Sequence, residues 1–317
     1  MPLPPLQHWT WQGEEGIFAV GYRHQSGAGT GAPVLLVHGF GASSDHWRAN
    51  IAPLAEQQPV WALDLLGFGS SDKPRSRLAD EPQGPDSVRY CFDLWAQQVA
   101  DFACLVVQPQ QPLQLVGNSI GGIVALRAAQ LLSERGVAPA QVILLNCAQR
   151  ALDDRRAALL PIWERWSRPM VKRLVRQRWL LQPLFRTVAR PLFVRQVLAQ
   201  AYPSGANVDQ DLIELLLRPS RQAGAVESFR GFVNLFRDHM APELLPQLDL
   251  PVRLLWGAAD PWEPIAEARR WAESHSCIQE LHELPGVGHC PHDEAPELTN
   301  EIIQKWLNTA IAKPTRR

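Results

Sequence analysis

The sequence contains no run of about 18 apolar residues, no C-x-x-C pair and almost no net charge. The first absence argues against a membrane-spanning helix. The five cysteines are scattered and odd in number, which favours a reducing compartment over a disulfide framework. The formal net charge of −1 gives no sign of the basic face that nucleic-acid-binding proteins carry, so we expect no nucleic-acid partner.

The first residues also lack the features of a targeting signal. Residues 1–11 read MPLPPLQHWTW, with prolines and without a basic stretch followed by an apolar run, so we expect no secretory signal and a cytoplasmic location. The chain does contain 46% apolar and 20% charged residues over 317 positions, which is typical of a globular protein with a large core.

Two compositional features have more than one interpretation. Twelve tryptophans indicate either core packing or an aromatic surface for a bulky apolar ligand or a bilayer interface. Residues 150–195 carry twelve Lys/Arg against three acidic residues. This segment is either a solvated helical face or a surface attracted to an anionic membrane, which would make the protein peripheral to a membrane.

Short runs rich in leucine and β-branched residues recur along the chain, separated by longer helical stretches. Continuous apolar runs of this length indicate a mostly parallel sheet with helices on both faces. Residues 7–11 and 17–22 are predicted to pair as an antiparallel hairpin at the sheet edge, which makes eight strands. The other strands are expected at 34–37, 60–63, 113–116, 142–145, 252–256 and 280–284, and a helix at 87–107.

The alternation stops between residues 149 and 248, where the sequence predicts helices and no strand. Proline lacks an N–H and clashes with the preceding turn, so it ends or kinks a helix. We therefore predict a core domain of residues 1–148 and 249–317 with a helical cap, 149–248, inserted in it. The prolines that divide the cap are Pro161, Pro169, Pro183, Pro191, Pro203 and Pro219.

Ser119 is the predicted nucleophile. It lies in Gly117-Asn118-Ser119-Ile120-Gly121, a G-x-S-x-G pattern between a predicted strand and a helix of small residues. Such a turn needs glycine on both sides because it is strained and neighbouring backbone passes close to it. The serine Oγ is then exposed at the C-terminal edge of the sheet.

A serine hydroxyl becomes a nucleophile when a base removes its proton. His289 is the predicted base because it follows the last strand, and Asp260, after strand 252–256, is predicted to orient it. The chain order Ser, Asp, His is the one found when the nucleophile lies in such a strand–helix turn. The alternatives are His292 for the base and Asp64 or Asp293 for the acid, whereas His38 is expected to be structural.

Two backbone N–H groups are predicted to bind the oxyanion, those of Phe40 and Ile120. No cofactor and no metal are expected. Gly67-Phe68-Gly69 lacks the third glycine of a dinucleotide fingerprint, no P-loop lysine follows a glycine cluster, and the histidines near residue 290 have no second ligand cluster.

Four segments together resemble the pheophytinase and chlorophyll dephytylase group of α/β-hydrolases, and the resemblance extends from about Pro33 to Trp306. Most of these motifs are widespread among α/β-hydrolases, whereas Asn118 and the string GHCPHDE are more specific. The segments are VHGFGAS at 37–43, ALDLLGFG at 62–69, GNSIGG at 117–122 and GHCPHD at 288–293.

The resemblance implies an α/β-hydrolase fold and cleavage of the phytyl ester of chlorophyll or pheophytin, an amphiphilic substrate, through an acyl-enzyme. Besides Asn118, the cap residues Trp163, Trp179 and Phe185 are expected to contact this substrate. Two alternatives stay open: a general carboxylesterase, lipase or carbon–carbon hydrolase of small acyl groups, and a non-catalytic pigment- or ligand-binding protein on the same fold.

Overall fold

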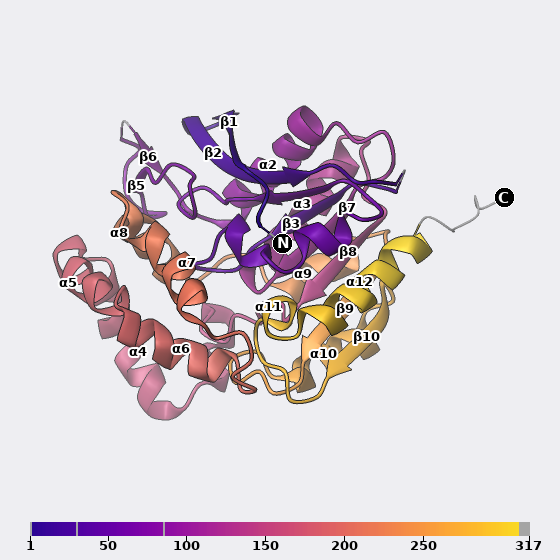
Figure 1. Ribbon diagram of the computed structural model, residues 1–317. Helices are drawn as coiled ribbons and strands as arrows, with labels where there is room; N and C mark the ends of the chain where they lie inside the picture. The colour runs from indigo at the N-terminus through magenta and orange to yellow at the C-terminus, as the bar shows by residue number, and fades with distance from the viewer. Residues whose placement is uncertain (1, 30, 85, 311–317) are drawn as a thin grey trace.

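The computed structural model describes residues 2–29, 31–84 and 86–310. Its centre is an eight-stranded sheet of order β1-β2-β4-β3-β7-β8-β9-β10 (Figure 1). The strands from β4 to β10 are parallel to one another, and β1 and β2 form the antiparallel edge. The bounds are β1 Leu6–Gly13, β2 Gly16–Gln25, β3 Val34–Val37, β4 Val60–Leu63, β7 Gln114–Asn118, β8 Gln141–Leu145, β9 Val252–Gly257 and β10 Ile278–Leu284.

Helices cover both faces of this sheet, because successive residues of its central strands point to opposite sides. In β3, Leu35 and Val37 join the larger core cluster, whereas Val34 and Leu36 join the second. The larger cluster lies against α2 (Phe92–Phe102), α3 (Ile120–Glu134) and α10 (Ile265–Ser274). The second lies against α1 (Ile51–Leu54) and α12 (Pro296–Ala310). The predicted fold class is therefore confirmed.

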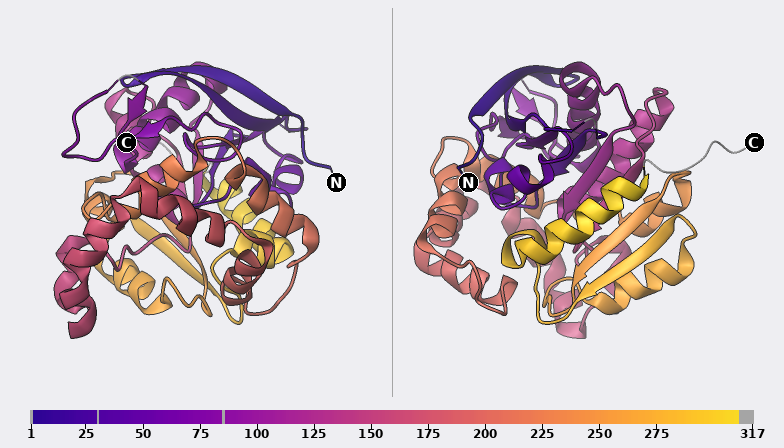
Figure 2. Two further views of the ribbon diagram at one scale, coloured as in Figure 1. Left: turned by 90° about the vertical axis from the view of Figure 1, so that its left-hand side faces the viewer. Right: turned by 45° about the vertical axis from the view of Figure 1, so that its right-hand side comes forward.

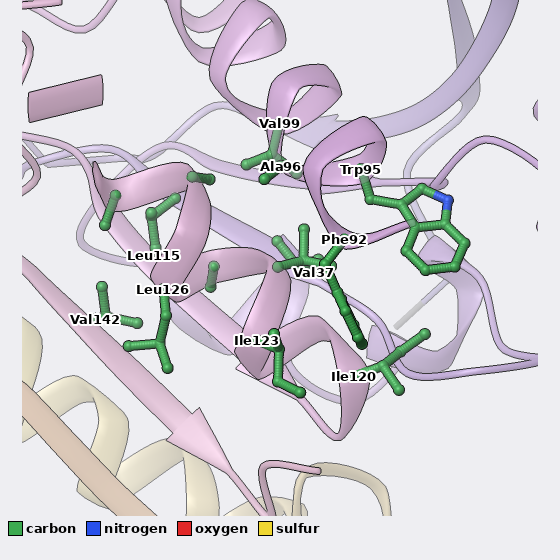
Figure 3. Packing of buried hydrophobic residues seen from close by; sticks show 14 of the residues in the cluster. Val37, Phe92, Trp95, Ala96, Val99, Leu115, Ile120, Ile123, Leu126 and Val142 are labelled. Carbon is green, nitrogen blue, oxygen red and sulfur yellow. The ribbon is translucent and has the colours of Figure 1, made fainter. Parts of the chain in front are cut away.

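The larger cluster fixes how the helix after Ser119 is held on the sheet. Figure 3 shows Ile123 and Leu126 of α3 in one cluster with the strand residues Leu115 and Val142. All four residues are fully buried. At about 25 cal/mol per Å² of apolar surface, burying each such side chain contributes roughly 1.5–3 kcal/mol.

The predicted helix at 87–107 is wrong at its start. Ser87–Val88 forms a short strand, β6, that pairs with β5 (Arg75–Ser76), and α2 begins only at Phe92. Cys91 caps it, since its backbone is extended and its Sγ accepts the N–H of Leu94 at 3.5 Å. Beyond α2 the chain continues as one π-helical stretch, η2 (Ala103–Val107).

Residues 149–240, which we call the insert, contain helices and no strand, and all of them are described. Figure 2 shows these helices gathered on one side of the sheet. Pro161 and Pro191 lie at helix starts, but Pro169, Pro183 and Pro219 lie within helices rather than ending them. The elements are η3 Asp154–Leu159, α4 Ile162–Val175, α5 Arg178–Val188, α6 Pro191–Ala201, α7 Gln210–Ser220 and α8 Ala225–Val233.

The division of the chain into a core and a cap ending at 248 stays a prediction. After the insert, α9 (Ala241–Leu244) and η4 (Leu245–Gln247) contribute Ala241, Leu244 and Leu245 to the larger core cluster, and α11 (Pro291–Glu294) precedes α12. Among the residues that the structure describes, no helix combines the length and the apolar character needed to cross a bilayer.

Candidate active site

Ser119 lies in a strained turn between β7 and α3. Its φ is +55° and its ψ is −123°, a backbone conformation that residues other than glycine rarely adopt. The turn is tight on both sides, because a Cβ at position 117 would overlap the carbonyl of Gly121 and one at position 121 would overlap the carbonyl of Val37. The two flanking glycines are therefore required by packing, and they leave Ser119 at the C-terminal edge of the sheet.

His289 and Asp260 form a buried hydrogen-bonded pair on the loops after β10 and β9. Nδ1 of His289 lies 2.7 Å from Oδ2 of Asp260. Because an ionised carboxylate can only accept, this contact puts the imidazole proton on Nδ1 and leaves Nε2 free to accept one. Asp260 also accepts the N–H of Trp262 at 2.8 Å and an amide N–H of Asn146 at 2.8 Å.

These hydrogen bonds keep Asp260 in its charged form. Burial alone raises the pKa of the Asp260 carboxyl, but the hydrogen bond from His289, its positive charge when protonated, and the donors Trp262 and Asn146 outweigh burial and hold the pKa below its usual value. The charged carboxylate can then stabilise an imidazolium at His289.

Ser119 and His289 line the same cavity, which has a volume of about 650 Å³ and lies between the sheet edge and the insert. Gly39, Phe40, Asn118 and Ile120 line it from the core side. The insert lines it with predominantly apolar residues: Ala151, Leu152, Val171, Val175, Val197, Leu198, Ala201, Tyr202, Leu216, Phe232, Val233, Leu235 and Phe236, together with Arg150 and Asp153.

The two predicted oxyanion donors flank Ser119. Ile120 is the first residue of α3, so its N–H has no partner within the helix. The loop after β3 comes close from the other side, since a Cβ at Gly39 would lie 3.1 Å from Cβ of Ser119. Phe40 follows in this loop, and its ring stacks on Phe232 at 3.9 Å. The role of the two N–H groups stays a prediction.

The main chain of His289 is held from two directions. Its carbonyl accepts an amide N–H of Asn118 at 3.1 Å, and the same amide nitrogen donates to the carbonyl of Leu145 at 3.2 Å. Its own N–H donates to the carbonyl of Ala201 at the end of α6, at 2.8 Å. Asn118 was expected to contact substrate. It lines the cavity, but its amide nitrogen joins β7, β8 and the histidine loop.

This geometry agrees with a comparison against known families, in which a model described as "Alpha/beta hydrolase family" matches residues 34–302. The chain belongs to this family. It is thus a hydrolase of the α/β type, with the sheet and helices found in many hydrolase structures.

Several known proteins are similar to this α/β-hydrolase over most of its length. An uncharacterized protein of Mycobacterium tuberculosis is 28% identical over 96% of this chain and 82% of its own. The chloroplastic pheophytinase of Arabidopsis thaliana is 26% identical over 86% of this chain and 60% of its own. The solved structure of a thermophilic esterase from Thermogutta terrifontis has a TM-score of 0.70 and 22% identity, covering 96% of this chain and 99% of that one.

The predicted substrate contacts in the cap, Trp163, Trp179 and Phe185, lie outside the lining of this cavity and stay a prediction. Trp163 and Trp179 are 68% and 71% exposed and do not line the cavity of this α/β-hydrolase. Phe185 packs against Phe229 at 5.3 Å and is also absent from the lining. For Trp163 the reason is the orientation of α4, which turns Val171 and Val175 toward the cavity and its tryptophans outward.

The other histidines considered for the base have different partners. His38 Nδ1 donates to the carbonyl of Gly39 at 2.7 Å and its Nε2 accepts the N–H of Leu65 at 3.0 Å, so this ring holds loops together. His292 lies 3.3 Å from His46 through Nε2 and Nδ1, is buried, and does not line the cavity. Burial lowers the pKa of His292 well below its usual value.

The alternative acids also have different partners. Asp64 accepts the main-chain N–H groups of Ser44 at 2.6 Å and Ser70 at 2.7 Å, and so braces the loop after β4. Asp293 accepts the hydroxyl of Tyr202 at 3.0 Å and Nε of Arg48 at 2.8 Å. Neither carboxylate is bonded to His289, so Asp260 is the acid that the structure brings to it.

Three residues of the cavity were missed at the sequence level. Trp262 lies edge-on against His289 with ring centroids 5.0 Å apart. Glu263 accepts the N–H of Gln149 at 2.8 Å, and burial raises the pKa of its carboxyl to about 8. Both directly follow Asp260 and Pro261, which is the signal that could have found them. His46 also lines the cavity, and no sequence signal distinguished it from the other histidines. Burial lowers the pKa of its imidazole to about 4.

Proposed function

We propose that this chain is a serine ester hydrolase in which Ser119 attacks the ester carbonyl, His289 accepts the serine proton and Asp260 orients the imidazole. The observation that carries the proposal is the 2.7 Å contact between His289 Nδ1 and Asp260, made by a histidine that lines one cavity with Ser119. A buried carboxylate on Nδ1 fixes the tautomer in which Nε2 is a base.

The reaction follows from these roles in two halves. In the first, Ser119 Oγ bonds to the carbonyl carbon, its proton passes to His289 Nε2, and the carbonyl oxygen becomes an anion facing the N–H groups of Phe40 and Ile120. The alcohol then leaves with the proton from His289, and an acyl-enzyme remains. In the second half, water gives a proton to the same nitrogen and attacks the acyl carbon. The bond from this carbon to Ser119 Oγ then breaks, the proton returns from His289 to Oγ, and the acid is released.

The cavity favours a substrate with one long apolar group. At roughly 30 Å³ per heavy atom, the share of liquid volume that one water occupies, 650 Å³ holds on the order of twenty atoms. A phytyl chain has that size, and each buried CH₂ contributes about 0.8 kcal/mol to binding. With the motif resemblance and the pheophytinase relative, this supports the phytyl ester of a chlorophyll-type pigment as the substrate.

Product analysis tests the proposal. Purified protein is incubated with chlorophyll, with pheophytin and with p-nitrophenyl butyrate, and Ser119→Ala serves as the control. We expect release of phytol from at least one pigment, lost by several orders of magnitude in the variant. Hydrolysis of p-nitrophenyl butyrate without hydrolysis of either pigment would favour the general esterase over the phytyl ester hydrolase. Failure of a fluorophosphonate to label Ser119 would favour a non-catalytic binding protein.

A further inference from the structure

Helix α4 exposes an apolar stripe to solvent. At about 100° per residue, Ile162, Trp163, Trp166, Met170 and Leu174 fall within roughly one third of the helix circumference. All five are exposed, Trp166 by 81%. The apolar stripe of an amphipathic helix normally faces the core of a globular domain, so this α4 stripe, as we call these five residues, lacks the partner that its pattern predicts.

The neighbouring elements extend the exposed apolar surface. Leu159 precedes α4, Trp179 lies on α5 and Leu192 lies in the first turn of α6, and each is more than two-thirds exposed. These helices form the outer layer of the insert, farthest from the sheet (Figures 1 and 2). Large apolar patches on a monomer mark a site where a protein or a membrane binds.

Basic side chains lie around this surface, and Arg173 lies within the arc of the α4 stripe itself. Arg165 and Arg173 on α4, Arg186 on α5 and Arg190 before α6 are exposed, and in the part of the chain that the structure describes none has a carboxylate within ion-pair distance. Of the few acidic residues nearby, Asp154 is already paired with Arg168 and Lys172. The surface around the stripe therefore carries an uncompensated positive charge.

The α4 stripe also borders the entrance of the cavity. Val171, next to Met170 in α4, is 45% exposed and lines the cavity, and so does Leu152, which is 60% exposed. An apolar surface thus continues from the outside of α4 into the cavity that holds Ser119. A binding partner on the stripe would lie beside this entrance.

We propose that the α4 stripe docks the protein on an anionic lipid bilayer, with its tryptophans in the interface and the four free arginines among the headgroups. Tryptophan and arginine together suit this position, because the ring is amphipathic and the charge meets anionic lipid. An ester dissolved in this bilayer would then enter the cavity past Leu152 and Val171. This entry rests on the proposed function, whereas docking does not.

Vesicle sedimentation tests docking. The full chain is mixed with phosphatidylcholine–phosphatidylglycerol vesicles and with pure phosphatidylcholine vesicles, and the bound fraction is measured at low and high salt. We expect binding to the anionic vesicles only, weakening with salt because headgroup charges are screened. Trp166→Glu/Met170→Glu should reduce it by more than about tenfold, since it places charge in the interface.

Leu298→Glu is the matched control, since Leu298 is an exposed leucine on α12 outside the insert and its change should leave binding unaltered. Thermal melts and hydrolysis of a soluble short ester should be the same in all variants. Ser119→Ala should still bind vesicles, so loss of the proposed chemistry and loss of docking are distinguishable. The proposal would be overturned if the wild type bound no vesicles, or if it bound both vesicle types equally. It would also be overturned if the stripe variant bound anionic vesicles as well as the wild type, or if light scattering showed a dimer that depends on the stripe.

Discussion

Replacing Asp260 with asparagine tests whether the buried pair at His289 supports catalysis. Asp260 receives four hydrogen bonds: Oδ2 accepts from His289 and Asn146, and Oδ1 accepts from the N–H groups of Trp262 at 2.8 Å and Glu263 at 3.2 Å. Every partner is a donor. An asparagine must therefore turn its own NH₂ toward two of them, whichever way it is oriented.

The magnitude depends on which side the NH₂ takes. If it faces His289, the imidazole must accept through Nδ1 and carry its proton on Nε2, where it can no longer act as a base. Loss of the correct tautomer costs about 10⁴-fold in kcat in a serine protease triad, which corresponds to about 5 kcal/mol. If it faces Trp262 and Glu263, two buried donors lose their acceptor, at about 1–3 kcal/mol of folding stability each.

The assay is the initial rate on a soluble aryl ester, together with the melting temperature. We expect kcat of Asp260→Asn to fall by at least about a thousandfold while the protein still folds. Asp293→Asn is the control, because Asp293 is equally buried but is bonded to Tyr202 and Arg48. It should lose stability and keep most of its activity. A kcat within about tenfold of the wild type for Asp260→Asn would refute the reasoning.

Three further predictions concern stability. Burial raises the pKa of the Glu263 carboxyl to about 8, so its contribution to folding stability is fully present below the unfolded pKa of 4.5 and is lost as the pH rises toward 8. In thermal melts, the melting temperature of Glu263→Gln should therefore rise relative to that of the wild type between pH 5 and pH 8. A constant difference between the two melting temperatures over this range would contradict the prediction. Gly121→Ala should destabilise by about 1–3 kcal/mol or prevent folding, since its Cβ would overlap the Val37 carbonyl, and an unchanged urea midpoint would exclude that overlap. Tyr202→Phe should cost about 1–3 kcal/mol in the same assay by removing a donor to Asp293.

The centre of the sheet could be predicted from the sequence because its central strands are buried on both faces and are therefore mostly continuous apolar runs. The segments 34–37 and 60–63 coincide with β3 and β4. The start of α2 could not be predicted in the same way. Residues 87–88 are diverted into a pairing with Arg75–Ser76, and a two-residue strand leaves no periodicity in the sequence.

The sequence predicted the proposed catalytic residues of the candidate site but not the residues of its cavity wall. Ser119, Asp260 and His289 could be proposed because each follows a strand at the same edge of the sheet, and the structure brings His289 to Asp260 and to the cavity of Ser119. The cavity wall could not. An amphipathic pattern on α4 identifies an apolar face but does not say whether that face turns inward, and here Trp163 points outward while Val175 lines the cavity.

The bond from the His289 amide to Ala201 has a mechanical consequence. Gly288 packs so closely on the same turn that a side chain there would overlap the Ala201 carbonyl. The end of α6 and the proposed base thus share one attachment point. Any opening of the insert that displaces α6 must either break this bond or drag residue 289 away from Asp260, so access and reactivity are coupled. Amide hydrogen exchange at residue 289 would report such an opening directly.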